Sequence, residues 1–275
     1  MRPGGKGAPG KTAGPQGRRQ DLPASGKNYD QRSSEKGRNA RMEGIYAFAG
    51  RRVRIRSLYS LVHEKCADYR AEGAPAFTVE TGAEEIAAER ARADGRGYGE
   101  DYLETLAVCR KIAETMPAYD AFLFHGSAVA ADGRGVIFTA PSGTGKSTHA
   151  RLWREMLGAR AKMINDDKPL IRVEASGQAA VFGTPWDGKH HLSANISAPL
   201  EAVCLLERGP ENRIREIGKG EALPALLVQT YRPREAEAVR RTLRMLERMQ
   251  VRLYRLRCNM DPAAAEISFR GIFGP

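Results

Sequence analysis

The sequence predicts a mixed α/β fold, with a small α+β lobe in front of the main α/β part. In the second half of the chain, short apolar runs alternate with turn residues and helical stretches. These runs lie at 122–124, 136–138, 163–164, 170–173 and 202–206. Strands interspersed with helices are typical of an α/β or mixed-sheet core. The first half instead has one extended stretch followed by helical ones, which predicts a separate lobe.

Residues 1–41 have the composition of a disordered tail. They are rich in Gly, Pro, Ser, Lys and Arg, and almost no large apolar residue precedes Ile45. Such a segment cannot bury enough surface to offset its ordering entropy. It carries ten Lys/Arg and three acidic residues, so the net charge of +11 leaves +4 for residues 42–275. This distribution argues against nucleic acid as a partner. One interpretation is that translation starts at Met42 and the tail is not native, and the sequence leaves this open.

The composition excludes several other classes of protein. A hydrophobic content of 41% and a charged content of 28% fit a soluble globular chain. No run approaches the roughly 18 apolar residues that span a bilayer, and no apolar segment of a secretory signal follows the basic N-terminus. We therefore expect a cytoplasmic protein without a membrane partner. The cysteines form no C-x-x-C pair, which argues against a zinc or redox site and favours buried thiols. They are Cys66, Cys109, Cys204 and Cys258.

Residues 42–118 are predicted to form the small N-terminal lobe. The chain is extended at 45–55, helical at 58–69 and extended again at 76–80. A further amphipathic helix is indicated by apolar residues that recur at spacings of three and four. These residues are Tyr102, Leu106, Cys109, Ala113 and Met116. We expect all five to fill the core.

Two helices of the second part are predicted by the same periodicity. The first covers about 147–157, with Ala150, Trp153 and Leu157 on one side. The second covers 235–249. Its expected buried face consists of Val239, Leu243, Leu246 and Met249.

A glycine-rich loop joins the apolar run 136–138 to the helix at 147–157. Gly143 and Gly145 allow the backbone to curl so that successive N–H groups point at one phosphate, and the helix that begins there adds its positive end. Lys146 brings a positive charge to the β- and γ-phosphates, and Ser147 offers a hydroxyl to Mg²⁺. The first glycine of the G-x-x-x-x-G-K-[ST] pattern is replaced by Ala140, a small change.

The sequence of this loop therefore predicts that it is a P-loop, which binds ATP with Mg²⁺. The residues expected to bind the nucleotide are Ser142, Gly143, Thr144, Gly145, Lys146, Ser147 and Thr148.

Two adjacent carboxylates follow the apolar run 163–164. Asp166 and Asp167 stand where a Walker-B acid is expected after a P-loop. One would hold Mg²⁺ directly or through water, and the other would accept the proton of an attacking hydroxyl or orient that hydroxyl. Adjacent residues of a strand point to opposite faces, so we expect different roles for the two. Ser147, Asp166 and Asp167 are the predicted metal-site residues, and the sequence leaves open which aspartate is the base.

Three motifs together resemble the catalytic domain of HPr kinase/phosphorylase, which shares its fold with ATP-dependent phosphoenolpyruvate carboxykinase. They are His125-Gly126-Ser127-Ala128-Val129, the loop Ser142–Ser147 and Asn165-Asp166-Asp167, in the order and spacing of that family. The resemblance covers residues 119–275. It implies a mixed sheet under the P-loop, His125 near the transferred phosphate, and the two aspartates as base and metal partner.

The chain departs from that family at two points. The family has an acid directly after the P-loop serine, where this chain has Thr148, as the carboxykinases do. The N-terminal lobe is also much shorter than that of full-length HPr kinase. The chain therefore resembles a small kinase related to HPr kinase, and HPr itself is not implied as the substrate.

We therefore predict an ATP- and Mg²⁺-dependent kinase that acts on a hydroxyl of a small molecule, peptide or protein. The predicted catalytic residues are His125, Lys146, Asp166 and Asp167. Two alternatives stay open: an ATP-binding regulatory or scaffold protein without turnover, and a carboxykinase-like enzyme, against which the chain length argues. The acceptor, a reverse phosphorylase reaction and assembly into a homo-oligomer are not defined by the sequence.

Weaker signals surround this site. The segment 183–191, with an exposed-looking Trp186, is interpreted either as a substrate-binding loop or as an ordinary loop. Glu207-Arg208 and Tyr231-Arg232-Pro233 end secondary elements and could line the cleft.

Overall fold

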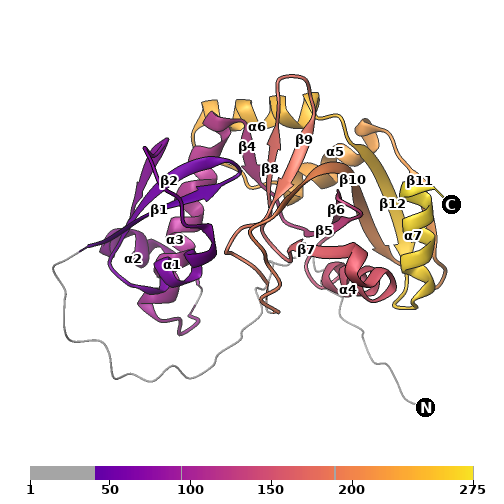
Figure 1. Cartoon of the computed structure of the whole chain (residues 1–275), viewed down its shortest axis with the longest axis horizontal. Coiled ribbons are helices and arrows are strands. Elements are labelled where there is room, and N and C mark those ends of the chain that lie inside the picture. The colour runs from indigo at the N-terminus through magenta and orange to yellow at the C-terminus, as the bar shows by residue number, and fades with distance from the viewer. Residues whose placement is uncertain (1–40, 94, 189, 275) are drawn as a thin grey trace, which may run out of the picture.

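The structure is a computed structural model that describes residues 41–93, 95–188 and 190–274. The predicted disordered tail, apart from Arg41, lies outside the described residues. Figure 1 shows a smaller N-terminal part beside a larger part that contains the main sheet. Among the helices in the described ranges, none has the length and apolarity needed to cross a membrane.

The N-terminal part begins with a β-hairpin. β1 (Met42–Phe48) pairs antiparallel with β2 (Arg51–Ser57), and β3 (Phe77–Glu80) pairs parallel with β2. The extended stretch predicted at 45–55 is therefore two strands. Ala49 and Gly50 connect them, and both have positive φ (49° and 77°), as in the tight turns that suit the twist of a hairpin.

Helices and 3₁₀ turns complete the described N-terminal part, and the 3₁₀ turn η3 (Met116–Tyr119) leads into the larger part. The others are α1 (Leu61–Lys65), the turn η2 (Ala67–Tyr69), α2 (Ala83–Arg92) and α3 (Glu100–Thr115). The helix predicted at 58–69 is thus shorter than expected. The α3 helix was expected from its apolar stripe, but the stripe is wrong at Tyr102, which is 39% exposed. Tyr102 lies in the first turn of α3, where its ring packs against Tyr98 outside the core.

A mixed sheet forms the larger part. Its strands run in the order β4 (Ala121–Leu123), β8 (Leu170–Val173), β9 (Ala179–Phe182), β10 (Ser197–Arg208), β6 (Arg134–Thr139), β5 (Ser127–Ala131) and β7 (Ala161–Asn165). In addition, β12 (Arg252–Cys258) pairs with β10 and with β11 (Arg213–Glu216). β6 and β12 run parallel to β10, and the remaining pairs are antiparallel. The mixed α/β class predicted from the sequence is confirmed.

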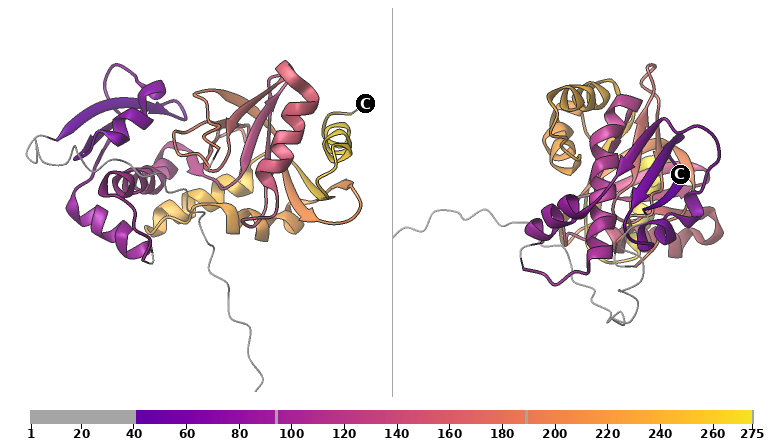
Figure 2. Two further views of the ribbon diagram at one scale, coloured as in Figure 1. Left: turned by 90° about the horizontal axis from the view of Figure 1, so that it is seen from below. Right: turned by 90° about the vertical axis from the view of Figure 1, so that its left-hand side faces the viewer.

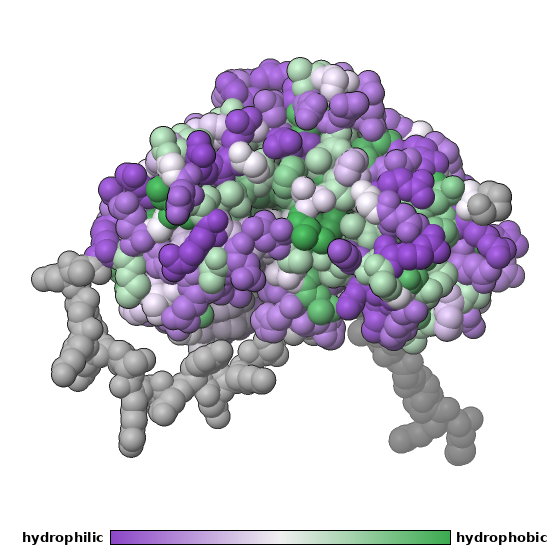
Figure 3. All heavy atoms as spheres, viewed as in Figure 1, coloured by the Kyte–Doolittle hydropathy of each residue, from purple (hydrophilic) through white to green (hydrophobic). Residues whose placement is uncertain are grey.

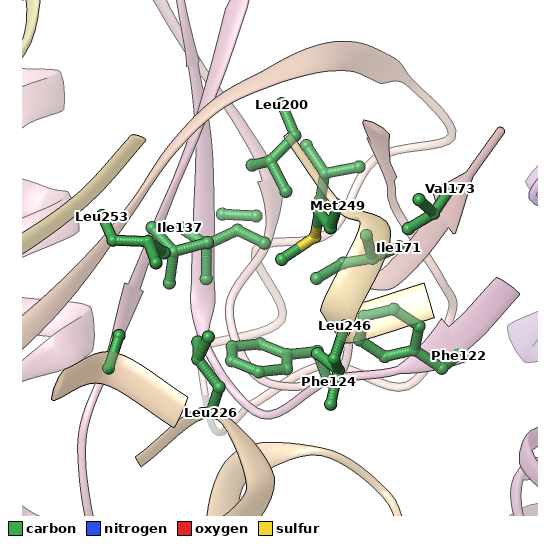
Figure 4. Packing of buried hydrophobic residues seen from close by; sticks show 14 of the residues in the cluster. Phe122, Phe124, Ile137, Ile171, Val173, Leu200, Leu226, Leu246, Met249 and Leu253 are labelled. Carbon is green, nitrogen blue, oxygen red and sulfur yellow. The ribbon is translucent and has the colours of Figure 1, made fainter. Parts of the chain in front are cut away.

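Helices cover both faces of this sheet. Figures 1 and 2 show α4 (Lys146–Leu157) and α7 (Ala263–Phe273) on one side, and α5 (Lys219–Gln229) and α6 (Ala236–Arg248) on the other. Side chains of the central strand β6 alternate between the faces, as a strand requires. Ile137 belongs to the same cluster as Leu226 of α5 and Leu246 of α6, which Figure 4 draws. The next residue, Phe138, packs on the other face against Trp153 of α4.

The face predicted for α4 is correct, whereas that for α6 is partly wrong. Ala150, Trp153 and Leu157 are all buried. On α6 the buried positions are Thr242, Met245 and Leu246, while Leu243 is 45% exposed. The apolar pattern alone does not say which side of a helix meets the sheet.

The two parts share one hydrophobic cluster. Phe48 of β1 and Ile112 of α3 belong to the same cluster as Leu170 of β8 and Trp186. The rings of Phe48 and Trp186 are 5.5 Å apart. The interpretation of Trp186 as exposed is wrong, because the N-terminal part covers this residue and leaves it only 4% exposed. The boundary between 118 and 119 stays a prediction.

The surface is mostly hydrophilic. On the face drawn in Figure 3, hydrophobic residues gather mainly toward the middle, and hydrophilic residues cover most of the two flanks. Exposed apolar side chains include Leu223, Leu227 and Val228 of α5. Cys66, Cys109 and Cys204 are buried thiols as expected, whereas Cys258 is only half-buried.

Candidate functional site

The glycine-rich loop connects the end of β6 to the start of α4. Gly143 has φ of 79° and Gly145 has φ of 125°, values that favour glycine. A Cβ atom at either position would meet nothing within 4 Å, so the backbone conformation rather than crowding calls for glycine here. Gly145 is the N-cap of α4 and gives no side-chain cap to the first turn. The loop therefore offers backbone N–H groups to an anion.

Lys146 lies folded back over this loop. Its Nζ donates to the carbonyl oxygens of Ala140 (3.0 Å) and Pro141 (3.4 Å), and the residue is only 8% exposed. Burial lowers the pKa of the Lys146 ammonium group, and the carboxylates of Asp167 and Asp166 oppose this shift. An ammonium group held by two carbonyl oxygens can exchange them for phosphate oxygens, which carry more charge.

The sheet brings the two aspartates to the loop. β5 pairs antiparallel with both β6 and β7, so β6 and β7 are parallel and end at the same edge. Asp166 follows β7 and is 4% exposed, and its Oδ1 accepts a hydrogen bond from Ser127 Oγ at 2.9 Å. Burial raises the pKa of Asp166, while hydrogen bonds from Ser127 and Ser147 act against the increase. The side chains of Asp166 and Ser147 thus face each other.

The side chain of Asn165 shapes the turn that holds both acids. Its Oδ1 accepts hydrogen bonds from the backbone N–H groups of Asp167 (2.8 Å) and Lys168 (2.6 Å), and its Nδ2 donates to Thr184 O (2.9 Å). The two aspartates were expected on opposite faces of a strand. That geometry is wrong, because β7 ends at Asn165 and the acids lie in the turn after it. They nevertheless contact different partners.

Asp167 lies between a histidine and a lysine. Its Oδ1 is 3.5 Å from His125 Nε2, and its Oδ2 is 2.7 Å from Lys168 Nζ. On the far side of the imidazole, His125 Nδ1 lies 2.7 Å from Gln229 Oε1. Burial lowers the pKa of His125, and the positive charge of Lys146 adds to this effect. The two ring nitrogens of His125 thus lie toward different partners, Nδ1 toward Gln229 and Nε2 toward Asp167.

A hollow of about 240 Å³ opens beside this pair. His125 and Asp167 line it, together with Leu123, Phe124, Lys168, Val228, Gln229, Thr230 and Tyr231. The segment after α5 is held here by backbone hydrogen bonds from His125 N to Gln229 O (2.8 Å) and from Tyr231 N to Leu123 O (2.9 Å).

Sequence reasoning missed two residues of this hollow. Gln229 lies 104 positions from His125 and belongs to no motif, so no local signal could have found it. Lys168 directly follows the acid pair in the sequence, and a cation next to two carboxylates could have indicated that it pairs with one of them.

A second hollow, of about 460 Å³, lies on the other flank of the loop. It is lined by Pro141, Ser142, Gly143, Thr144, Leu206, Glu207 and Arg208. Ser142 and Gly143 are exposed here, whereas Ser147 and Thr148 in the first turn of α4 are half-buried.

The donors for a metal ion are few but of a suitable kind. In the ranges that the structure describes, no three His, Cys, Asp or Glu side chains gather into a metal site. Ser147 and Asp166 provide oxygen ligands beside the loop. Mg²⁺ that arrives on a nucleotide keeps phosphate and water ligands and needs only one or two from the protein. The donor set therefore fits a nucleotide-borne Mg²⁺.

The segment 183–191 lies against the acid pair and is fixed by its tryptophan. Trp186 Nε1 donates to Thr105 O of α3 at 2.9 Å. A Cβ atom on Gly188 would lie 3.3 Å from Asp166 Oδ2, so this backbone passes close to that carboxylate. Lys189, in the same predicted segment, lies outside the described residues.

Comparisons with known proteins found a family model and distant solved structures. Residues 99–259 match the family model described as SynChlorMet cassette protein ScmC. This range covers more than half of the chain and begins directly before α3. A solved HPr(Ser) kinase/phosphatase from Coxiella burnetii is 12% identical, with a TM-score of 0.31 over 53% of this chain and 93% of that chain. None of the curated proteins matches the sequence.

Proposed function

We propose that this chain, which belongs to the family of the SynChlorMet cassette protein ScmC, is a kinase that transfers the γ-phosphate of Mg²⁺-bound ATP to a hydroxyl group. One observation carries the proposal: the glycine-rich loop before α4, the buried Asp166 and the pair of His125 and Asp167 meet at one edge of the sheet. Phosphoryl transfer needs mainly positioning and charge stabilisation, and these groups supply both.

Different partners support different roles for the two aspartates. Asp166 is buried and near the hydroxyl of Ser147, so these two residues would hold Mg²⁺. When bound, the ion would neutralise charge on the phosphate oxygens. Asp167 lines the hollow of about 240 Å³ and would accept the proton of the acceptor hydroxyl. The hydroxyl oxygen then bonds to the γ-phosphorus, and the bond from that phosphorus to the β-phosphate oxygen breaks to release ADP.

His125 and Lys146 would act on the phosphate itself. His125 lies between Gln229 and Asp167, with its Nε2 toward Asp167. In the proposed reaction, the imidazole would lie beside the reacting hydroxyl and the phosphate. Lys146 would leave the carbonyl oxygens of Ala140 and Pro141 and bind the β- and γ-phosphates.

Binding is tested by thermal unfolding with Mg-ATP. At about 100 times its dissociation constant, a ligand stabilises the protein by roughly 2.7 kcal/mol, which raises the melting temperature by about 5–10 °C for a domain of this size. The Lys146→Ala variant should lose most of this increase. The matched control is Lys162→Ala, which removes an exposed lysine of β7. An equal increase for Lys146→Ala and the wild type would refute the P-loop assignment.

Turnover is tested by phosphate incorporation from labelled ATP into small molecules and peptides that carry hydroxyl groups. Asp167→Asn should abolish transfer but still bind Mg-ATP, whereas Asp166→Asn should also lose the Mg²⁺ dependence of binding. The opposite pattern would exchange the two roles.

A second candidate function is nucleotide binding without turnover. The ion pair between Lys168 Nζ and Asp167 Oδ2 at 2.7 Å favours it, because this cation already occupies one oxygen of the carboxylate that would act as the base. The wild type would then bind Mg-ATP but would not consume it, whichever acceptor is added.

A further inference from the structure

The two hollows lie on opposite flanks of the P-loop. In the sheet, β6 has β5 on one side and β10 on the other, so the loop that follows β6 lies between the ends of these neighbours. The His125–Asp167 pair is on the β5 side, and the hollow of about 460 Å³ is on the β10 side. The two hollows share no lining residue. A triphosphate whose γ-phosphate points to Asp167 therefore extends its other end toward β10.

The size and the lining of the β10-side hollow suit a small organic group. Ligand pockets typically measure roughly 300–1,000 Å³ and combine apolar surface with a few convergent polar groups. Here Pro141 and Leu206 are apolar, and Glu207 and Arg208 bring one charge of each sign.

Arg208 is oriented by the loop itself. Its Nη2 donates to Gly143 O, and its Nε donates to Thr144 O at 3.3 Å. These bonds use one edge of the planar guanidinium group, while Arg208 as a whole stays exposed. A guanidinium group held along one edge can still bind through its flat face, and such a face stacks well on an aromatic ring.

Glu207 is held in place by Arg255 of β12. Its Oε1 accepts a hydrogen bond from Arg255 Nη1, and Arg255 Nε also donates to Glu221 Oε1 at 2.9 Å. The carboxylate of Glu207 is therefore fixed at the rim, and its second oxygen can accept hydrogen bonds from hydroxyl groups.

We propose that the β10-side hollow is the nucleoside subsite, in which the base stacks on the face of Arg208 and the ribose hydroxyls donate to Glu207. This assignment depends on the proposed function, because it takes the P-loop as the site of the phosphates. The ligand class is a ribonucleoside triphosphate. A polyphosphate without a nucleoside would contact the P-loop and leave the β10-side hollow empty.

Isothermal titration calorimetry with two probes, each with Mg²⁺, tests this subsite. Mg-ATP carries a nucleoside, and inorganic tripolyphosphate does not. Arg208→Ala should weaken Mg-ATP binding about tenfold, the scale of one base stack, and leave tripolyphosphate binding within about twofold. Glu207→Gln should weaken ATP several-fold and leave 2′,3′-dideoxy-ATP unchanged. Arg241→Ala is the control, since this exposed arginine of α6 shares Glu237 with two other arginines and should change neither affinity.

Each other result overturns the subsite. An equal loss of both ligands in Arg208→Ala would mean that Arg208 only supports the loop, and no loss would mean that the nucleoside binds elsewhere. A failure of the proposed function looks different. In that case the wild type binds neither probe, or Lys146→Ala binds tripolyphosphate as well as the wild type does.

Discussion

His149, in the first turn of the helix that follows the glycine-rich loop, should make the protein sensitive to acid. The residue is 2% exposed, and burial lowers the pKa of its imidazole to about 4. Ser268 Oγ donates to Ala265 O (3.0 Å) and therefore accepts hydrogen bonds from both Trp153 Nε1 (2.8 Å) and His149 Nε2 (2.9 Å). The proton of the neutral imidazole is thus on Nε2. His149 Nδ1 is buried without a hydrogen-bond partner, so protonation there would create an unpaired charge.

The magnitude follows from the difference between the folded and unfolded pKa of His149. A folded pKa of about 4 against an ordinary value of about 6.5 corresponds to about 3 kcal/mol. Because the folded pKa is lower, the unfolded chain binds the proton more tightly. The free energy of unfolding should therefore begin to fall as the pH drops below about 6.5, and this loss should be complete below about 4.

Urea unfolding of the wild type and of His149→Gln between pH 7.5 and about 4 measures this effect. The variant should lack this part of the pH dependence, since an amide does not titrate. Other groups titrate in both proteins, so the comparison isolates His149. An NMR titration of the wild-type imidazole gives the pKa directly. A value near 6.5, or the same pH dependence in both proteins, would refute the reasoning.

Three further predictions concern residues that shape the site. Gly145→Ala forces a side chain into φ of 125°, which costs about 1–3 kcal/mol, so we expect calorimetry to detect no Mg-ATP binding to a variant that still folds. Trp186→Ala removes a buried indole and its bond to Thr105 O, so urea unfolding should show a loss of about 3–5 kcal/mol, and a loss below about 1 kcal/mol would contradict the packing. Tyr231→Phe removes the hydrogen bond to Glu114 Oε1 at 2.7 Å, so the free energy of unfolding should fall by about 1 kcal/mol. The affinity for Mg-ATP should stay unchanged, and weaker nucleotide binding would contradict the proposal that the hollow lined by Tyr231 receives the acceptor.

Local sequence patterns predicted the secondary structure of the site better than the contacts that surround it. The strand, loop and helix at 135–157 are predictable because positive φ at Gly143 and Gly145, a lysine and a following serine leave a signal within a few residues. The mixed sheet was expected from the family resemblance, because spacing alone does not distinguish parallel from antiparallel neighbours.

Contacts between distant segments could not be predicted in the same way. The burial of Trp186 depends on Phe48 and Thr105, which lie more than eighty residues earlier in the chain. Asp166 and Asp167 were interpreted as strand residues, because the sequence does not show that the side chain of Asn165 bonds to the next backbone N–H groups and turns the chain there. Gln229 reaches His125 only because the segment after α5 lies beside β4.

A crystal structure with Mg²⁺ and a non-hydrolysable ATP analogue tests the central claim most directly. We predict that the phosphates lie within hydrogen-bond distance of the backbone N–H groups of residues 143–147 and of Lys146 Nζ, with the γ-phosphate toward Asp167. A triphosphate bound elsewhere, with Lys146 still on the carbonyl oxygens of Ala140 and Pro141, would contradict the account.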